Sequence, residues 1–346
     1  MGQNDSLPTF RYALEQSPAR EMPGGTAREA TIKQLPISTG LAGVSMKLKP
    51  GAIRELHWHA IAAEWAYVIR GNVRTTIVGP GGTCETNDFA PGDVWYFPRG
   101  HGHAIACLGD EECHFLLIFD NGAFSEFGTF SSTDWVGHID ASVLGRCLGV
   151  SAAELSGLAH EELYIVQGRP LPATIEPNRG SELRPAPQTH RYPFMAQPPW
   201  ETFSGGRQWR VTVDEFPIST TMSASLFELE PGAVREPHWH PHANEWQYVL
   251  EGTVRVGLFG SGGRARVEQL NAGDVGYAPR GYGHYIENCG DKMCRILVAF
   301  DSGQYQEISL STWLSANPAG MVADNFQVPD ALVAKWPTKR VFVAKK

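Results

Sequence analysis

The chain has 346 residues, of which 42% are hydrophobic and 19% charged, and its formal net charge is −8. This composition is that of a globular protein with room for two hydrophobic cores, and it excludes a disordered chain. The net charge is acidic and the sequence contains no block of basic residues, which argues against a nucleic-acid partner. No apolar run approaches the roughly 20 residues of a membrane span.

The first residues and the cysteines bear on the cellular compartment. Residues 1–8 contain neither a basic segment nor an apolar core, so we expect no secretory leader. The six cysteines lack C-x-x-C spacing, which suits buried thiols in a reducing compartment better than a disulfide framework. We therefore expect a cytoplasmic protein. The cysteines are Cys84, Cys107, Cys113, Cys147, Cys289 and Cys294.

Most of the chain is an internal repeat. The segment 36–39 (Pro-Ile-Ser-Thr) recurs at 217–220, and matched residues keep this offset of 181 positions over most of each half. The offset then changes, since Trp135 matches Trp313 at a distance of 178 positions. The first half therefore carries three extra residues after about Glu126, and an insertion of this kind marks a loop that differs between the halves.

Short β-strands are the first elements predicted in each half. In the first half, the segments 66–69, 73–78 and 115–119 are rich in β-branched and aromatic residues and are bounded by Gly or Asp. The whole chain contains 37 Gly and 24 Pro, which favours turns between short strands. These features predict a mainly β fold with two tandem barrels of the jelly-roll type.

Each barrel is predicted to end in a short helical patch. Ser151 and Glu154 form a capping-box pattern in the first half. In the second half, Pro329 suits the first position of a helix over 330–335.

The proline-rich stretch 169–199 is predicted to link the two domains. We place the boundary near residue 185. This gives an N-terminal domain over 1–185 and a C-terminal domain over 186–346.

Three histidines and one glutamate in each half are the strongest functional signal. His57 and His59 are two positions apart, so on a strand both side chains point into the barrel, while Glu64 and His103 follow from later elements. The set recurs 181 positions later as His238, His240, Glu245 and His284. A single His-x-His is usually an ordinary pair of histidines, but two copies with matching partners argue against that interpretation. Imidazole and carboxylate ligands without a thiolate suit Mn, Fe, Co or Ni better than structural zinc.

Two motifs in each half resemble the two cupin motifs. In the first half they read Gly51-x5-His57-x-His59-x4-Glu64-x6-Gly71 and Gly92-x5-Pro98-x-Gly100-x2-His103. Longer segments resemble the bicupin oxalate decarboxylases, and this resemblance runs from about residue 20 to the end. These segments are 54–59, 64–67, 95–98, 133–135, 245–248 and 273–277.

The resemblance implies a manganese enzyme with two Mn(2+) per chain. Such an enzyme converts oxalate to formate and CO2, and it needs dioxygen without consuming it overall. The resemblance also implies a homo-oligomer, either a trimer or a hexamer, with a small-molecule substrate and neither a nucleic acid nor a membrane as partner. The reaction requires a metal that changes oxidation state, a cation near the substrate carboxylate and a positioned acid.

The same resemblance identifies Arg54 as a residue that contacts bound oxalate, with Arg235 as its counterpart in the second half. A guanidinium suits a carboxylate. Each arginine lies three positions before its first histidine, so on a regular strand it would lie on the opposite face, unless it lies in the turn after Gly51. The alternative interpretation of Arg54 is a surface salt bridge.

By resemblance, Glu126 is the proton donor, on a lid over the N-terminal metal. Ser125 and Glu126 match the family's lid motif, whereas Phe127 and Gly128 depart from it, since the family pattern has Asn and Ser there. This departure bears on the balance between decarboxylation and oxidation. The alternative interpretation of Glu126 is an exposed loop carboxylate.

The second half differs at the positions of the acid. The family's other candidate acid falls on Val298, which cannot transfer a proton, and Glu307 aligns with Glu126 but lacks the inserted loop. We therefore predict that the N-terminal site is catalytic and that the C-terminal site is mainly structural. Trp58 and Trp239 either aid electron movement between sites in different subunits or simply pack as aromatic side chains.

Three other functions are compatible with parts of the pattern. An oxalate oxidase would use the same metal and substrate but release hydrogen peroxide and CO2, and Glu126 argues against it. An iron- or copper-dependent bicupin dioxygenase would need a roomier apolar pocket for an aromatic substrate. A non-enzymatic storage-type bicupin would normally have lost metal ligands, and here all eight are present.

Overall fold

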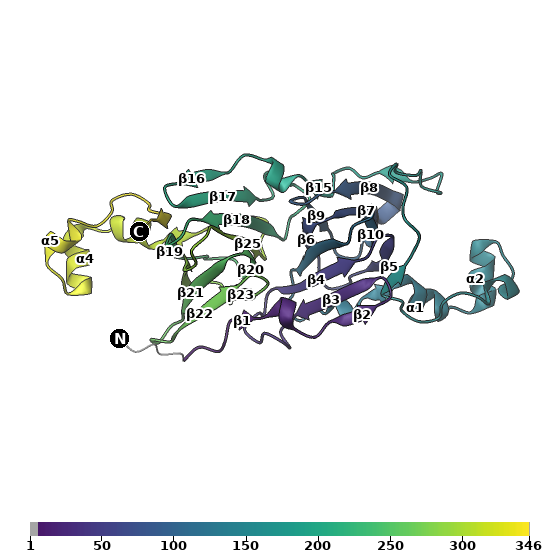
Figure 1. The fold of residues 1–346 in the computed structure, drawn as a ribbon, viewed down its shortest axis with the longest axis horizontal. Coiled ribbons are helices and arrows are strands. Elements are labelled where there is room, and N and C mark those ends of the chain that lie inside the picture. Colours follow the sequence, from purple (N-terminus) through teal and green to yellow (C-terminus); the bar gives the residue numbers. More distant parts are fainter. Residues whose placement is uncertain (1–5, 346) are drawn as a thin grey trace.

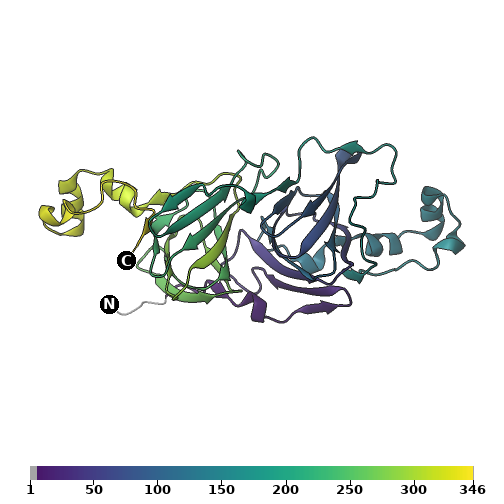
Figure 2. The same cartoon turned by 45° about the horizontal axis from the view of Figure 1, so that its top comes forward.

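The structure, a computed structural model, describes residues 6–345. Two β-barrels lie side by side, and short helices extend from the two opposite ends of the molecule (Figures 1 and 2). The prediction of a mainly β chain with two tandem barrels is thus confirmed. Residues 1–5, on which part of the expectation about a secretory leader rests, lie outside the described residues. No helix in the described part of the chain is long and apolar enough to cross a membrane.

The N-terminal barrel is built from two antiparallel sheets. The first contains, in spatial order, β15 (Arg191–Tyr192), β9 (Val94–Phe97), β6 (Glu64–Arg70), β11 (Cys113–Phe119), β4 (Ala42–Leu48), β3 (Gly25–Ala30) and β2 (Arg20–Met22). The second contains β12 (Phe130–Ser131), β5 (Ala52–Trp58), β10 (Gly102–Leu108), β7 (Asn72–Gly79), β8 (Thr83–Phe89) and the parallel β14 (Arg184–Pro185), with β13 (Ile165–Gln167) also paired to β5. The three strands predicted for this half lie within β6, β7 and β11.

The C-terminal barrel repeats this plan. One sheet contains, in spatial order, β1 (Arg11–Tyr12), β23 (Val275–Ala278), β20 (Glu245–Glu251), β25 (Cys294–Phe300), β18 (Ser223–Leu229), β17 (Gly206–Val211) and β16 (Glu201–Phe203). The other contains β22 (Ala265–Asn271), β21 (Thr253–Phe259), β24 (Gly283–Asn288), β19 (Val234–Trp239) and β26 (Ile308–Ser309), with β27 (Val343–Ala344) also paired to β19.

The central strands are apolar on both faces because each faces two cores. In β6, Ala66 and Val68 belong to the core inside the N-terminal barrel, whereas Trp65 and Tyr67 belong to a cluster shared with the C-terminal barrel. Side chains of a strand alternate between its faces, so a continuous apolar run results where both faces are buried. The shared cluster includes Trp246 of the second barrel, and it holds the two domains together.

The predicted linker 169–199 does not run free between the domains. Its β15 pairs with β9 of the first barrel, while β1, which precedes the first barrel, pairs with β23 of the second (Figure 1). The two exchanged strands carry equivalent ion pairs, between Arg11 and Asp274 (2.8 Å) and between Arg191 and Asp93 (2.7 Å).

The helices form the two ends of the molecule. They are α1 (Ser132–Gly137), α2 (Ala141–Leu148), α3 (Leu310–Ser315), α4 (Ala319–Phe326) and α5 (Asp330–Val333), with 3-10 turns η1 (Leu14–Gln16), η2 (Pro80–Gly82), η3 (Glu126–Gly128), η4 (Ala152–Leu155) and η5 (Phe194–Ala196). The predicted capping box of Ser151 and Glu154 is present, but it starts the 3-10 turn η4. Pro329 is the N-cap of α5, not its first residue, because its backbone is extended (ψ 144°).

Candidate metal centres

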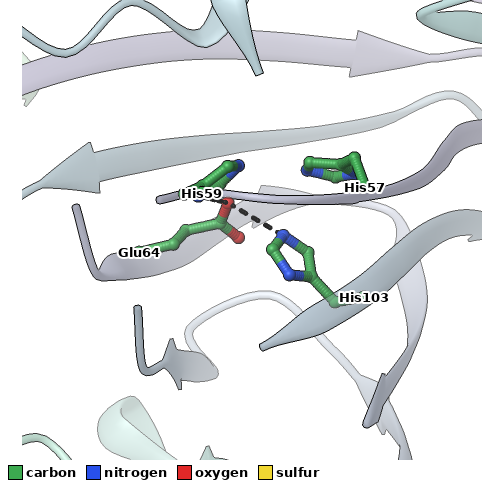
Figure 3. A group of neighbouring side chains, drawn as sticks. All are labelled: His57, His59, Glu64 and His103. Carbon is green, nitrogen blue, oxygen red and sulfur yellow. Dashed lines mark ion pairs between the residues drawn. The ribbon is translucent and has the colours of Figure 1, made fainter. Parts of the chain in front are cut away.

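The first predicted ligand set converges in the N-terminal barrel. His57 comes from β5, His59 follows that strand, Glu64 begins β6, and His103 comes from β10. One ligand atom from each residue lies within 4.8 Å of the others, and all four side chains are buried. Figure 3 shows the Glu64 carboxylate between His59 and His103, with His57 beside them.

Backbone carbonyls orient two of these imidazoles. The Nδ1 of His57 lies 2.6 Å from the Glu55 carbonyl and the Nδ1 of His103 lies 2.9 Å from the His101 carbonyl, so each Nδ1–H donates and each Nε2 keeps its lone pair for the centre. Burial, the charge of Arg54 and the neighbouring imidazoles lower the pKa of His57 well below its usual value. His57 is therefore neutral, which is the form that binds a metal.

Four buried atoms in this centre have no hydrogen-bond partner among the described residues. They are the Nε2 atoms of His57, His59 and His103 and the Oε2 of Glu64. Unpartnered buried polar atoms are costly, and a cation bound among these four neighbouring side chains offers them a partner. The donor set therefore fits a divalent metal ion.

Trp95 supports this centre, although sequence reasoning did not identify it. Its indole Nε1–H donates to Oε1 of Glu64 at 2.7 Å, which leaves Oε2 turned toward the histidines. The only sequence signal was the position of Trp95 within a family-like segment. Partners of this kind orient a ligand and raise metal affinity.

The second ligand set converges in the same way in the C-terminal barrel. The ligand atoms of His238, His240, Glu245 and His284 also lie within 4.8 Å of one another, and all four side chains are buried. Here Oε2 of Glu245 lies 2.8 Å from Nε2 of His240 and 3.1 Å from Nε2 of His284. Despite burial, these two imidazoles lower the pKa of Glu245 well below its usual value. Gln247 donates to Oε1 of Glu245 at 2.6 Å and so takes the role of Trp95.

Arg54 lies on the same side of β5 as His57, and the expectation from odd spacing is corrected by a β-bulge. Arg54 is within β5, not in the turn after Gly51, and its side chain is fully buried. Along the pairing with β10, Arg54 faces Ile105 and His57 faces His103, so three steps on β5 oppose two on β10. The extra residue in β5 shifts the alternation of side chains between the two faces of the strand, so that Arg54 and His57 point to the same face. Arg235 reaches the second centre through the same irregularity in β19.

The Arg54 guanidinium forms a buried ion pair with Glu126. Its Nε donates to Oε1 of Glu126 at 2.7 Å and its Nη2 donates to the Thr129 hydroxyl at 2.7 Å. The other carboxylate oxygen of Glu126 lies 3.3 Å from Nε2 of His59. Burial raises the pKa of Glu126, but the charge of Arg54 and the contact with His59 outweigh it and lower the pKa to about 2. Glu126 is thus a buried carboxylate at the metal centre, not an exposed loop residue.

The inserted loop carries Glu126 on the 3-10 turn η3. The Ser125 hydroxyl caps this turn by accepting the Phe127 N–H at 3.3 Å, and it donates to Glu29 at 2.7 Å. The Phe127 ring packs edge-on against Tyr164, with 5.7 Å between ring centroids. Gly128 has open space where a side chain would lie, so this loop is tied down mainly through Ser125, Glu126 and Phe127.

The second centre has its own arginine–glutamate pair, which the sequence did not lead us to expect. Glu307 forms an ion pair with the buried Arg235 and accepts a hydrogen bond from the Tyr305 hydroxyl. The Ser309 hydroxyl donates to the other carboxylate oxygen of Glu307 at 3.2 Å. Val298 is buried in the barrel core. The shorter connection thus brings Glu307 to Arg235, and several contacts hold it there.

Trp58 and Trp239 lie on the outer faces of the barrels in aromatic clusters. Trp58 packs with Phe130 (5.3 Å between centroids) and Trp135 (5.5 Å), and Trp239 packs with Trp313 (5.4 Å). Phe130, Trp135 and Trp313 are each more than half exposed. The two outer faces therefore carry equivalent exposed aromatic patches.

Comparison with known proteins agrees with this architecture. The family model described as Cupin matches residues 11–156 and 194–333. The chain is 42% identical over 323 residues to the oxalate decarboxylase OxdC of Bacillus subtilis, covering 92% of this chain and 82% of that protein. It is 32% identical over 343 residues to a probable oxalate decarboxylase of Arthroderma benhamiae, covering 98% and 84%.

Solved structures agree with these sequence matches. A structure of the B. subtilis oxalate decarboxylase at pH 4.6 matches with a TM-score of 0.92 and 39% identity, covering 99% of this chain and 89% of that one. Another structure of that enzyme, from work on its Mn(II) centres, matches with a TM-score of 0.91 and 39% identity, covering 99% and 90%.

Proposed function

We propose that this chain, which belongs to the bicupin oxalate decarboxylases of the cupin family, converts oxalate to formate and CO2 with manganese in both centres. The observation that carries the proposal is a buried arginine–carboxylate pair, Arg54 with Glu126, beside three histidines and a glutamate. Such a site offers metal ligands, a cation for the substrate and an acid at one place.

The residues that would hold the first manganese ion are His57, His59, Glu64 and His103. Imidazole and carboxylate donors suit Mn(2+), and the relative from B. subtilis has Mn(II) centres. When bound, the metal supplies one-electron redox chemistry and positive charge beside the substrate, with dioxygen as the required co-catalyst. The second ion would be held by His238, His240, Glu245 and His284.

Arg54 would bind one carboxylate of oxalate. Its guanidinium is fully buried and its charge is balanced by Glu126, so an incoming oxalate has to displace Glu126 from it. The exchange replaces one carboxylate by another and therefore keeps the buried guanidinium paired. Arg235 would bind a carboxylate in the second site by the same contact.

Glu126 would supply the proton. While it is paired with Arg54 its pKa of about 2 keeps it ionised, so it becomes able to carry a proton only after oxalate takes its place. The overall reaction consumes one proton, because the oxalate dianion becomes formate and CO2. That proton has to reach the carbon which becomes the C–H of formate, and Glu126 is the carboxyl group beside the site.

The N-terminal site is the better candidate for catalysis. Glu126 begins the 3-10 turn η3 next to the insertion, and this turn ends at Gly128, where a side chain would meet no other atom within 4 Å. Glu307 is held at Arg235 by the hydroxyls of Tyr305 and Ser309 as well. A carboxylate with more fixed partners is slower to leave the arginine, so we assign a mainly structural role to the second site.

The first test measures both products. The manganese-loaded protein is given oxalate and oxygen, and formate and hydrogen peroxide are assayed together for the parent, Glu126→Gln and Glu307→Gln. We expect formate from the parent, a loss of about 100-fold or more in Glu126→Gln and a much smaller loss in Glu307→Gln. A larger loss in Glu307→Gln would move catalysis to the second site.

The same assay separates the decarboxylase from an oxalate oxidase. Phe127 and Gly128, which depart from the family's lid motif, are the specific reason to keep the oxidase as second candidate. Peroxide as the main product of the parent would establish it. Neither product from a protein with manganese bound would refute oxalate as the substrate.

We also propose a cytoplasmic homo-oligomer, either a trimer or a hexamer. The exposed aromatic patches around Trp58 and Trp239 support a contact between subunits, and such a contact would bring tryptophans of different subunits near each other. Light scattering on the purified protein tests the oligomer, and a monomer at micromolar concentration would contradict it.

A further inference from the structure

The ring of Tyr164 lies between two arginines. The guanidinium carbon of Arg54 lies 4.2 Å from the ring centroid and that of Arg20 lies 4.1 Å from it. Tyr164 is fully buried, whereas Arg20 comes from β2 near the surface. The ring therefore joins the arginine of the metal centre to an outer arginine that touches neither the metal ligands nor Glu126.

Tyr164 is held in an uncommon backbone conformation. Its φ is 60°, in the left-handed region that non-glycine residues rarely adopt. Its N–H donates to Oε1 of Glu55 at 2.7 Å, and its carbonyl accepts from Nη1 of Arg54 at 3.3 Å. Strain of this kind persists only where the surroundings impose it, and it clusters at functional sites.

The second half of the repeat contains the same arrangement. Phe342, 178 positions after Tyr164, has a φ of 59° and donates its N–H to Glu236 at 2.6 Å. The guanidinium carbon of Arg235 lies 3.7 Å from its ring centroid and that of Arg340 lies 4.5 Å from it. Each centre thus has an aromatic ring that contacts its own arginine and an outer one. In the second half, Phe203 also stacks on the ring with 4.4 Å between centroids, and Arg340 also lies 3.7 Å from Glu307.

Each outer arginine forms an ion pair with a glutamate, but the arginine and the glutamate occupy exchanged positions in the two halves of the repeat. Arg20 pairs with Glu162 at 2.9 Å, and Arg340 pairs with Glu201 at 2.5 Å. In the repeat, Arg20 matches Glu201 at 181 positions and Glu162 matches Arg340 at 178 positions. The pair is therefore reversed in charge between the halves, yet in both an arginine lies over the ring.

We propose that Arg20 and Glu162 are positioning residues that set the Arg54 guanidinium through the Tyr164 ring. When a carboxylate displaces Glu126, the remaining partners of Arg54 among residues 6–345 are the Tyr164 ring and carbonyl and the Thr129 hydroxyl. Arg20 then prevents the ring from moving away from Arg54, and Glu162 holds Arg20 in place. The inference rests on the proposed role of Arg54 in binding oxalate.

The test uses four variants of the full-length manganese-loaded protein. They are Arg20→Lys, Arg20→Glu, Glu162→Arg and the double variant Arg20→Glu/Glu162→Arg, which builds in the first half the charge order of the second. Arg20→Lys keeps the charge but loses the flat guanidinium that stacks on the ring. Arg70→Glu, which breaks the exposed pair of Arg70 with Glu112 on the same barrel, is the matched control.

We expect each single variant at 20 or 162 to raise the KM for oxalate about five- to tenfold with kcat within twofold, and we expect the double variant to restore the parent KM within twofold. Manganese content and melting temperature should stay at the parent values, as in Arg70→Glu. An unchanged KM in Arg20→Lys would overturn the proposal. So would a rise in KM that is accompanied by a fall in kcat and in manganese content, and so would a folded double variant in which KM is not restored.

The dissociation constant of formate, measured by calorimetry, gives a readout that does not depend on turnover. This dissociation constant should rise in the variants in which KM rises, and it should return to the parent value in the double variant. If the parent does not convert oxalate, the proposed function fails, and formate binding still tests the positioning of Arg54. Equal formate affinity in the parent and all variants would overturn the positioning role even if the parent is a decarboxylase.

Discussion

Replacement of Glu85 by Gln should remove a pH-dependent clamp between the first barrel and the chain that leads to the second. Glu85 on β8 accepts the N–H and the Nδ1–H of His190, each at 2.7 Å, and the Thr189 hydroxyl at 2.7 Å. Burial raises the pKa of Glu85, but the hydrogen bonds from His190, Asn87 and Thr189 outweigh it and lower the pKa to about 2.

The size of the effect follows from this pKa. The difference between the usual 4.5 and about 2 corresponds to about 3 kcal/mol of folding free energy. The Glu85 side chain is 20% exposed, so solvent screening reduces the expected contribution to about 2 kcal/mol. Because the pKa is lower in the folded state, this stabilisation is fully present above pH 4.5 and is lost as the pH falls from there toward 2.

Urea unfolding of the parent and of Glu85→Gln, at pH 7 and at pH 3, measures this contribution to the free energy of unfolding. We expect the variant to be less stable by about 2 kcal/mol at pH 7 and the difference to lose more than half of its size at pH 3. Loss of metal at acidic pH affects both proteins and cancels in the comparison. Glu182→Gln, at an exposed carboxylate of the same connecting segment, is the control and should match the parent at both pH values. A destabilisation of equal size at pH 7 and pH 3 would refute the reasoning.

Three further predictions concern the centres. Turnover consumes a proton, so activity should fall as the pH rises above the weakly acidic range, and a flat profile from pH 4 to 8 would contradict this. Trp95→Phe removes the hydrogen bond to Glu64 and should weaken manganese binding in the first centre about 10-fold or more. Competition with a chelator measures this affinity, and the second centre is the internal control. An equal loss of manganese from both centres would contradict the prediction. Phe127→Ala removes a ring contact worth about 1 kcal/mol from the lid and should lower the ratio of formate to peroxide about fivefold; an unchanged ratio would rule out a role for that contact.

The ligand sets were predictable because His57 and His59 are two positions apart and the repeat supplies the same four residues twice. The position of Arg54 beside His57 was not predictable from spacing, since it depends on a bulge that appears only in the pairing of β5 with β10. A single residue inserted in one strand reverses every side-chain direction beyond it.

The supporting residues could not be found from the sequence for a similar reason. Tyr164 and Glu55 lie 109 positions apart and meet because β13 returns along β5, where Glu55 accepts the Tyr164 N–H. Nothing near Tyr164 in the sequence marks its left-handed backbone, and the carboxylate that accepts its N–H is distant in the sequence. The contact of Glu307 with Arg235 was not predicted either, because the alignment of Glu307 with Glu126 does not show where the shorter connection directs the side chain.

Because the two halves of the repeat exchange strands, they are not two independent structural domains. The proposed boundary near residue 185 divides two similar sequences, but β1 crosses it to complete the second barrel and β15 returns to complete the first. A cut at that boundary would therefore leave each barrel without an edge strand and its ion pair, and would expose the apolar cluster that contains Trp65 and Trp246. Strand pairing in both directions and a shared core bind the two centres into one folding unit. The structural role that we propose for the second centre agrees with this, because a metal bound in the C-terminal barrel would also stabilise the surface on which the N-terminal barrel is built.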